Sequence, residues 1–77
     1  HSKTLSLYTV ESNISKKIGS IQRKYKKFVD IGSYPFFRLG KVGVAIVTRS
    51  TSLKKLNNVH IELMKLVKLK KIKILKI

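Results

Sequence analysis

The stretch GSYPFFRLGKVGVAIVTR, residues 32–49, decides the fold because it predicts two neighbouring strands of different character. Its second half, residues 41–49, is small or apolar on both faces, which is typical of a central strand. Its first half lies in a strand expected over residues 28–37, where aromatic residues favour a sheet but Pro35 restricts the strand to an edge. The short Gly-containing connection over residues 38–41 therefore predicts an antiparallel hairpin.

A strand and a helix are predicted before this hairpin. Residues 3–10, KTLSLYTV, alternate apolar and polar side chains and then continue with β-favouring residues, as a half-buried strand does. Ser12 or Asn13 is expected to cap the helix that follows, and Glu11 to place negative charge near its positive end. That helix is predicted as far as about Lys27. Its apolar stripe consists of Ile14, Ile18, Ile21, Tyr25 and Phe28.

A second helix and a last strand are predicted after the hairpin. Ser50, Thr51 and Ser52 offer helix caps. The apolar stripe beyond them consists of Leu53, Leu56, Val59, His60, Leu63, Met64 and Val67. Residues 69–77 are interpreted as a basic tail or a short last strand, and the alternative is a helix that continues to Leu75, because no Gly or Pro stops it.

The predicted order is strand, helix, strand, strand, helix, strand. Two right-handed crossovers in that order give an α+β fold, the ferredoxin-like two-layer sandwich with a four-stranded antiparallel sheet. The expected spatial order of the strands is four, one, three, two. This order places Pro35 on one edge strand and the Lys-rich last strand on the other edge, where charge discourages pairing between molecules.

Length and composition indicate one small domain over residues 3–77, with His1 and Ser2 interpreted as residues left by cloning. The chain has no cysteine, and 43% of its residues are apolar, so a hydrophobic core is its expected source of stability. No apolar stretch approaches the roughly 18 residues that a membrane-spanning helix needs, and no signal peptide is recognisable. A soluble, cytoplasmic domain is therefore expected.

The residues needed for catalysis do not occur in a productive pattern. The three acidic residues, Glu11, Asp30 and Glu62, have no spacing that predicts a general acid and base. His60 and Glu62 are two apart on a predicted helix, so they face different sides, and His60 is expected at the core or its boundary. No phosphate-binding glycine loop precedes a helix. No catalytic, cofactor-binding or metal-ligating residue is predicted.

The net charge of +15 raises the question of a partner, because such a charge attracts nucleic acid or acidic protein surfaces. Fifteen of the 18 basic residues are lysines spread along the chain, which also fits a solvated surface in a lysine-rich protein. A one-sided sandwich leaves one sheet face uncovered. The predicted partner surface comprises Tyr8, Tyr34, Pro35, Phe36, Phe37 and Arg49.

Two kinds of partner remain open for this surface. One is a neighbouring domain of the same chain or a second copy. The other is RNA, because domains of this strand and helix order stack bases on aromatic residues of the first and third strands. The predicted third strand lacks aromatic residues, which counts against RNA, although Tyr8, Tyr34 and Arg49 could form a small stacking patch.

Three segments carry a family resemblance over roughly residues 7–67. Glu11-Ser12 at the start of a helix, IGSYPFF at residues 31–37 and VGVAIVTRS at residues 42–50 resemble the region after the molybdopterin-binding domain in the competence/damage-inducible protein A family. The same IGSYP sequence is similar to one near the molybdopterin-binding-like half of FAD synthases. The tail after Val67 is outside the resemblance.

The resemblance implies a non-catalytic accessory domain that packs on a neighbouring domain or takes part in dimer contacts. For the parent protein it implies a nucleotide pyrophosphatase-like or molybdopterin-binding enzyme, with molybdopterin or a nucleotide as ligand. The Gly-Gly-Thr-Gly phosphate loop of that family is absent from this segment, so no cofactor is expected in it.

Overall fold

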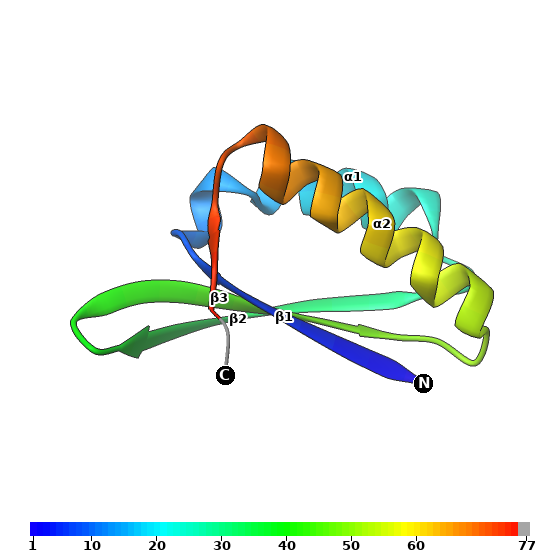
Figure 1. The fold of residues 1–77 in the computed structure, drawn as a ribbon. Coiled ribbons are helices and arrows are strands. Elements are labelled where there is room, and N and C mark those ends of the chain that lie inside the picture. The colour runs from blue at the N-terminus through cyan, green and yellow to red at the C-terminus, as the bar shows by residue number, and fades with distance from the viewer. Residues whose placement is uncertain (76–77) are drawn as a thin grey trace.

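The strands form one antiparallel sheet in the order β2-β3-β1-β4 (Figure 1). The computed structural model describes residues 1–75, so the end of the predicted tail, residues 76–77, lies outside the described part. The elements in chain order are β1 (Ser2–Tyr8), the short 3-10 helix η1 (Glu11–Asn13), α1 (Ser15–Lys24), β2 (Asp30–Arg38), β3 (Lys41–Arg49), α2 (Leu53–Leu69) and β4 (Lys73–Ile74). The predicted ferredoxin-like sandwich and its strand order are confirmed.

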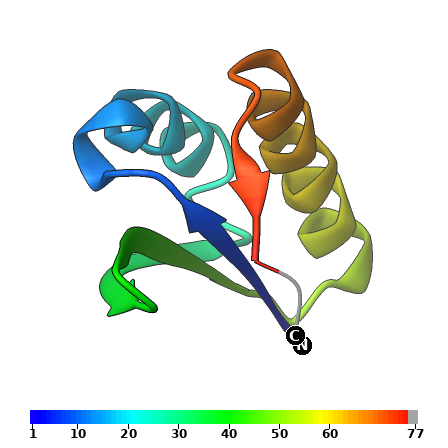
Figure 2. The ribbon, with the colours of Figure 1, turned by 60° about the vertical axis from the view of Figure 1, so that its left-hand side comes forward.

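Both helices lie on the same face of the sheet and enclose the hydrophobic core against it (Figure 2). Alternate residues of β1 and β3 point toward the helices, as the cross-strand pairs Leu5–Ile46 and Leu7–Val44 illustrate. The buried apolar residues are Leu5, Leu7, Ile14, Ile18, Ile21, Val29, Val44, Ile46, Leu56, Val59, Leu63, Leu66 and Val67. Within residues 1–75 no helix covers the other face of the sheet.

The two edge strands occupy the places that their sequences predict. β2 is an edge strand, and its Pro35 pairs with Val44 of the central strand β3 without having to donate a hydrogen bond to a further strand. β4 is the other edge strand and pairs with Leu7 and Tyr8 of β1. The positions of both edge strands therefore agree with the ferredoxin-like order that was predicted from the sequence of elements.

A two-residue turn connects β2 to β3. Leu39 and Gly40 have φ angles of 53° and 74°, so both residues are in the left-handed region, as in a type I′ hairpin turn. Glycine adopts this conformation without strain, whereas the Cβ of a leucine approaches the following carbonyl oxygen. Leu39 is 83% exposed, so burial of its side chain does not offset the strain.

Leu39→Asn is expected to raise the free energy of unfolding by about 1 kcal/mol, because asparagine tolerates the left-handed region and favours this turn type. The measurement is urea denaturation, with the dependence on denaturant unchanged between the two proteins. Leu39→Ala, which keeps a Cβ but gains no turn preference, should give no such increase. A lower stability for Leu39→Asn would contradict the assignment of the turn.

The start of α1 differs from the prediction that Ser12 or Asn13 caps it. The N–H groups of Asn13 and Ile14 instead donate to carbonyl oxygens of the η1 turn, each at 3.1 Å, and the residue before α1 is the buried Ile14. Glu11 lies in η1, and the first turn of α1 contains no acidic residue. The Glu11 carboxylate accepts a hydrogen bond from the Ser33 hydroxyl at 2.9 Å, which ties η1 to β2.

α1 also ends three residues earlier than predicted, at Lys24. Phe28, expected in the buried stripe, is 51% exposed, and β2 begins at Asp30 rather than at residue 28. The side chain of Gln22 explains the break, because its amide group donates to the carbonyl of Val29 at 2.8 Å and accepts from the N–H of Ile31 at 2.6 Å. One side chain thus connects α1 to the start of β2.

The cap of α2 follows the prediction. The Ser52 hydroxyl oxygen accepts a hydrogen bond from the backbone N–H of Lys55 at 3.2 Å. The Ser50 hydroxyl donates to the carbonyl of Phe28 at 2.6 Å and accepts from the N–H of Ser52 at 3.0 Å. The serines between β3 and α2 therefore start the helix and fasten it to the turn that precedes β2.

The end of α2 decides between the two interpretations of the tail, and the longer helix is excluded. α2 ends at Leu69, and Lys71 reverses the chain with a φ of 55°. The N–H of Ile72 donates to the carbonyl of Val67 at 3.0 Å, which is the hydrogen bond of a Schellman motif. Among residues 1–75, no helix is long and apolar enough to cross a bilayer.

Candidate functional site

The uncovered side of the sheet, called the open face below, is built from alternate residues of β1, β2 and β3. Its cross-strand pairs include Thr4–Val47 and Ser6–Ala45 between β1 and β3. The open face comprises Thr4, Ser6, Tyr8, Asp30, Gly32, Tyr34, Phe36, Arg38, Lys41, Gly43, Ala45, Val47 and Arg49. Small and apolar side chains lie at its centre, and aromatic side chains lie toward the hairpin.

An aromatic pair marks the hairpin end of the open face. The ring centroids of Tyr8 and Phe36 are 6.3 Å apart at an interplanar angle of 63°, an edge-to-face contact that stabilises both rings. The Phe36 ring lies over the Cα of its cross-strand partner Gly43, in space that any Cβ at position 43 would occupy. The Nζ of Lys41 lies 5.3 Å from the centroid of the Tyr8 ring.

Tyr34 is held in a similar way. Its ring leans along β2 over Gly32, where a Cβ would lie 2.9 Å from the tyrosine hydroxyl oxygen. Glycines at positions 32 and 43 therefore let Tyr34 and Phe36 lie close to the sheet. Sequence reasoning missed these contacts, although a glycine opposite or two residues from an aromatic residue on one strand face was a usable signal.

The six residues of the predicted partner surface do not form one surface. Tyr8, Tyr34 and Phe36 share the hairpin half of the open face. Arg49 is also on this face but six residues from Gly43 along β3, which is roughly 20 Å, so it does not complete a stacking patch with Tyr8.

Pro35 and Phe37 point to the opposite side of the sheet from Tyr34 and Phe36. They pair with Val44 and Val42, whose side is the one that the helices cover. The hairpin extends beyond the helices, so Phe37 is 74% exposed although it is on the core side of β2 (Figure 1). The prediction placed these residues together only because they are neighbours in sequence.

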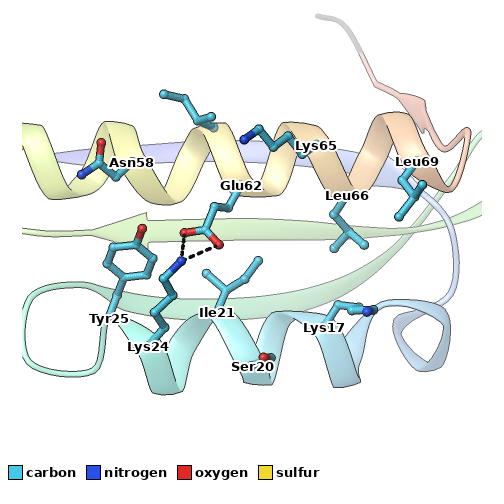
Figure 3. Close-up of a pocket in the computed structure, with 11 residues that line it drawn as sticks. Lys17, Ser20, Ile21, Lys24, Tyr25, Asn58, Glu62, Lys65, Leu66 and Leu69 are labelled. Atoms are coloured by element: carbon cyan, nitrogen blue, oxygen red, sulfur yellow. Dashed lines mark hydrogen bonds and ion pairs between the residues drawn. The ribbon is translucent and has the colours of Figure 1, made fainter.

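A second candidate site, which sequence reasoning did not find, is a groove between α1 and α2 (Figure 3). The groove has a volume of about 550 Å³. It is lined by Lys17, Ser20, Ile21, Lys24 and Tyr25 from α1 and its end, and by Asn58, Ile61, Glu62, Lys65, Leu66 and Leu69 from α2. We call it the helix groove.

One ion pair crosses the helix groove. The Nζ of Lys24 lies 3.2 Å from a carboxylate oxygen of Glu62. Hydrogen bonding with the Tyr25 hydroxyl lowers the pKa of Glu62, against burial and with help from Lys24 and Lys65. The same carboxylate, together with burial, raises the pKa of Tyr25. The acid in the groove is therefore held in its charged form.

His60 is half-buried on α2, as its position in the predicted stripe indicated. Burial lowers its pKa, and the positive charge of Lys3 lowers it further, so the neutral imidazole is favoured. Within residues 1–75, no three His, Cys, Asp or Glu side chains are close enough together to hold a metal ion. His60 lies at the boundary of the core.

The fold and the open face define the class of this protein: a basic ferredoxin-like α+β domain with an uncovered aromatic sheet face. Residues 1–76 match the family model described as FAD synthase, middle domain, and the chain belongs to this family. The similarity to FAD synthases that IGSYP indicated is confirmed. A middle domain is an accessory part of a larger protein.

Two further comparisons returned no match: no curated protein and no solved structure is significantly similar. The resemblance to competence/damage-inducible protein A therefore stays a prediction. The match covers nearly the whole sequence, including the residues after Val67 that lay outside the resemblance.

Proposed function

We propose that this domain packs its open face against a neighbouring domain of the same chain, and that this neighbour binds a nucleotide or a pterin, as the molybdopterin-binding resemblance implies. The observation that carries the proposal is the aromatic pair Tyr8–Phe36, which is held close to the sheet over Gly43 on a face that no helix covers within residues 1–75. Aromatic residues are enriched at the centres of protein interfaces.

The small side chains at the centre of the open face support a protein partner. Ala45 and Val47 at its centre are small, so a partner can approach the sheet closely there. A middle domain has neighbours in its parent protein, which supply such a partner at high effective concentration. Contact with a neighbour would bury apolar surface that otherwise stays in water.

Charge favours a different domain over a second copy. Two copies that each carry +15 repel one another, and any contact between identical open faces would bring together Arg38, Lys41 and Arg49, against the single acid Asp30. A neighbour with an acidic or neutral surface meets no such cost. Self-association or RNA binding through the open face would contradict the proposal.

The test uses the parent protein with its neighbouring domains and the variant Ala45→Arg, which places a large charge at the centre of the open face and leaves the core unchanged. In wild type, the backbone amides of β3 are expected to exchange hydrogen at least tenfold more slowly than in the isolated domain. Ala45→Arg should remove that difference. Ile61→Arg, in the helix groove, is the matched control and should leave it unchanged.

Three outcomes would overturn the proposal. Equal exchange in the isolated domain and the parent protein would show that the open face stays uncovered. A dimer of the isolated domain that Ala45→Arg dissociates would assign the face to self-association. Binding of single-stranded RNA that is lost in Tyr8→Ser and Phe36→Ser would assign it to nucleic acid, since stacking depends on these rings.

A further inference from the structure

The helix groove lies on the other side of the molecule from the open face, so a partner could occupy it independently. It opens between α1 and α2, away from the sheet (Figure 3). The lining residues of α2 run from Asn58 to Leu69, a length of about 16 Å or three helical turns. The groove therefore has the length that a short helix would cover.

Apolar side chains form part of its lining. Ile21 and Leu66 are buried beneath it, whereas Ile61 is 53% exposed and Leu69 is 77% exposed. Exposed apolar side chains of this size contribute to the free energy of binding when another apolar surface covers them and removes them from water. A ligand that only offers charge would leave Ile61 and Leu69 in water.

The charges of the groove are predominantly positive. Lys17, Lys24 and Lys65 line it, and the single acid in the lining, Glu62, is paired with Lys24. Lys17 on α1 and Lys65 on α2 have no ion-pair partner within residues 1–75. In Figure 3 both lie on the flanks of the groove, and Leu66 and Leu69 line its end on the side of Lys17.

We propose that the helix groove docks an acidic amphipathic helix of a partner protein. The apolar stripe of that helix would cover Ile61, Leu66 and Leu69, and carboxylates on its two sides would pair with Lys17 and Lys65. Docking of an amphipathic helix in a groove is a common mode of peptide recognition. The complementary charges would also speed association with a domain of net charge +15.

Charge and apolar lining together select this occupant. A second copy of the chain carries only three acidic residues and would be repelled. A nucleic-acid backbone would satisfy the lysines but would place phosphates beside Ile61 and Leu69. An acidic helix with an apolar stripe satisfies both sets of residues.

The test measures fluorescence anisotropy of a labelled 18-residue peptide helix, with leucines on one side and glutamates flanking them, titrated with the parent protein. The double variant Lys17→Glu/Lys65→Glu is expected to weaken binding at least tenfold. Leu69→Ser should weaken it several-fold, and the high exposure of Leu69 keeps this change from affecting the fold. Circular dichroism checks that each variant is folded.

The matched control is Lys16→Glu/Lys68→Glu, which makes the same charge change on the same two helices at residues that do not line the groove. It should alter binding less than twofold at about 0.15 M salt, where distant charges are screened. Ala45→Arg on the open face should also have no effect, so the outcome is separate from that of the function proposed above.

Several results would overturn the proposal. One is equal weakening by the two double variants, because binding would then depend on net charge alone. Another is equal affinity for a peptide with the same composition in scrambled order, which cannot form an apolar stripe. A third is the absence of peptide binding by wild type at millimolar concentration. A fourth is single-stranded RNA that displaces the peptide from wild type and no longer binds the Lys17→Glu/Lys65→Glu variant. That result would assign the groove to nucleic acid.

Discussion

Gly43→Ala should lower the free energy of unfolding by about 2–3 kcal/mol, at the upper end of the range for excess volume in a packed site. A Cβ at position 43 would lie 2.7 Å from the carbonyl oxygen of Leu7 and would overlap the Phe36 ring. The ring can move, but the carbonyl belongs to the backbone of the neighbouring strand. The sheet must therefore shift between β1 and β3, which urea denaturation will detect as a lower midpoint.

Gly19→Ala is the matched control, because it adds the same methyl group within α1. The nearest atom to the added Cβ would be in the flexible Arg23 side chain at 3.5 Å, an ordinary contact. The free energy of unfolding of this variant should rise by about 0.5–1 kcal/mol, because alanine has a higher helix propensity than glycine. Opposite signs for the two substitutions are expected, and a neutral or stabilising Gly43→Ala would contradict the close approach of β1, β3 and Phe36.

The sheet could be predicted because its signals are local. Pro35 restricts β2 to an edge, and the small apolar residues of β3 indicate a strand with neighbours on both sides. The two-residue turn between them leaves only an antiparallel pairing. These signals, the order of elements and the handedness of the crossovers together favour the ferredoxin-like order of the four strands.

The helix boundaries could not be predicted, because contacts between distant residues and an unusual backbone conformation set them. Gln22 ends α1 early by bonding to the strand that follows. Lys71 ends α2 in the left-handed conformation, where the sequence would lead one to look for glycine. A lysine at this position does not indicate a helix end in the sequence, which is why a helix through Leu75 was a reasonable alternative.

The candidate sites could be predicted only in part, because they too depend on how residues distant in the sequence are arranged in space. The aromatic residues of SYPFF were recognised as a partner surface, but alternation along β2 divides them between two sides of the sheet. The helix groove depends on which residues of α1 face α2, and no sequence motif predicts that arrangement. The motif IGSYP was more informative about the family than about any site.

Ile46→Ala should lower the free energy of unfolding by about 3–4 kcal/mol, because it removes a completely buried side chain from the central strand and leaves a cavity beneath the helices. A 77-residue domain is expected to have a total stability of only about 4–12 kcal/mol. The variant should therefore be close to unfolding, with a large drop in the urea midpoint. Ile46→Val, which removes one methylene, should lose about 1 kcal/mol and stay folded.

Val42→Ala is the matched control, because Val42 lies four residues away on the same side of β3 as Ile46. Its side chain is 55% exposed, since the hairpin extends beyond the helices there. This substitution should cost less than about 0.5 kcal/mol, as expected for a surface position. A loss comparable to that of Ile46→Ala would mean that the core extends under the hairpin tip, because the cost of truncating a side chain on one strand face depends on whether a helix covers it.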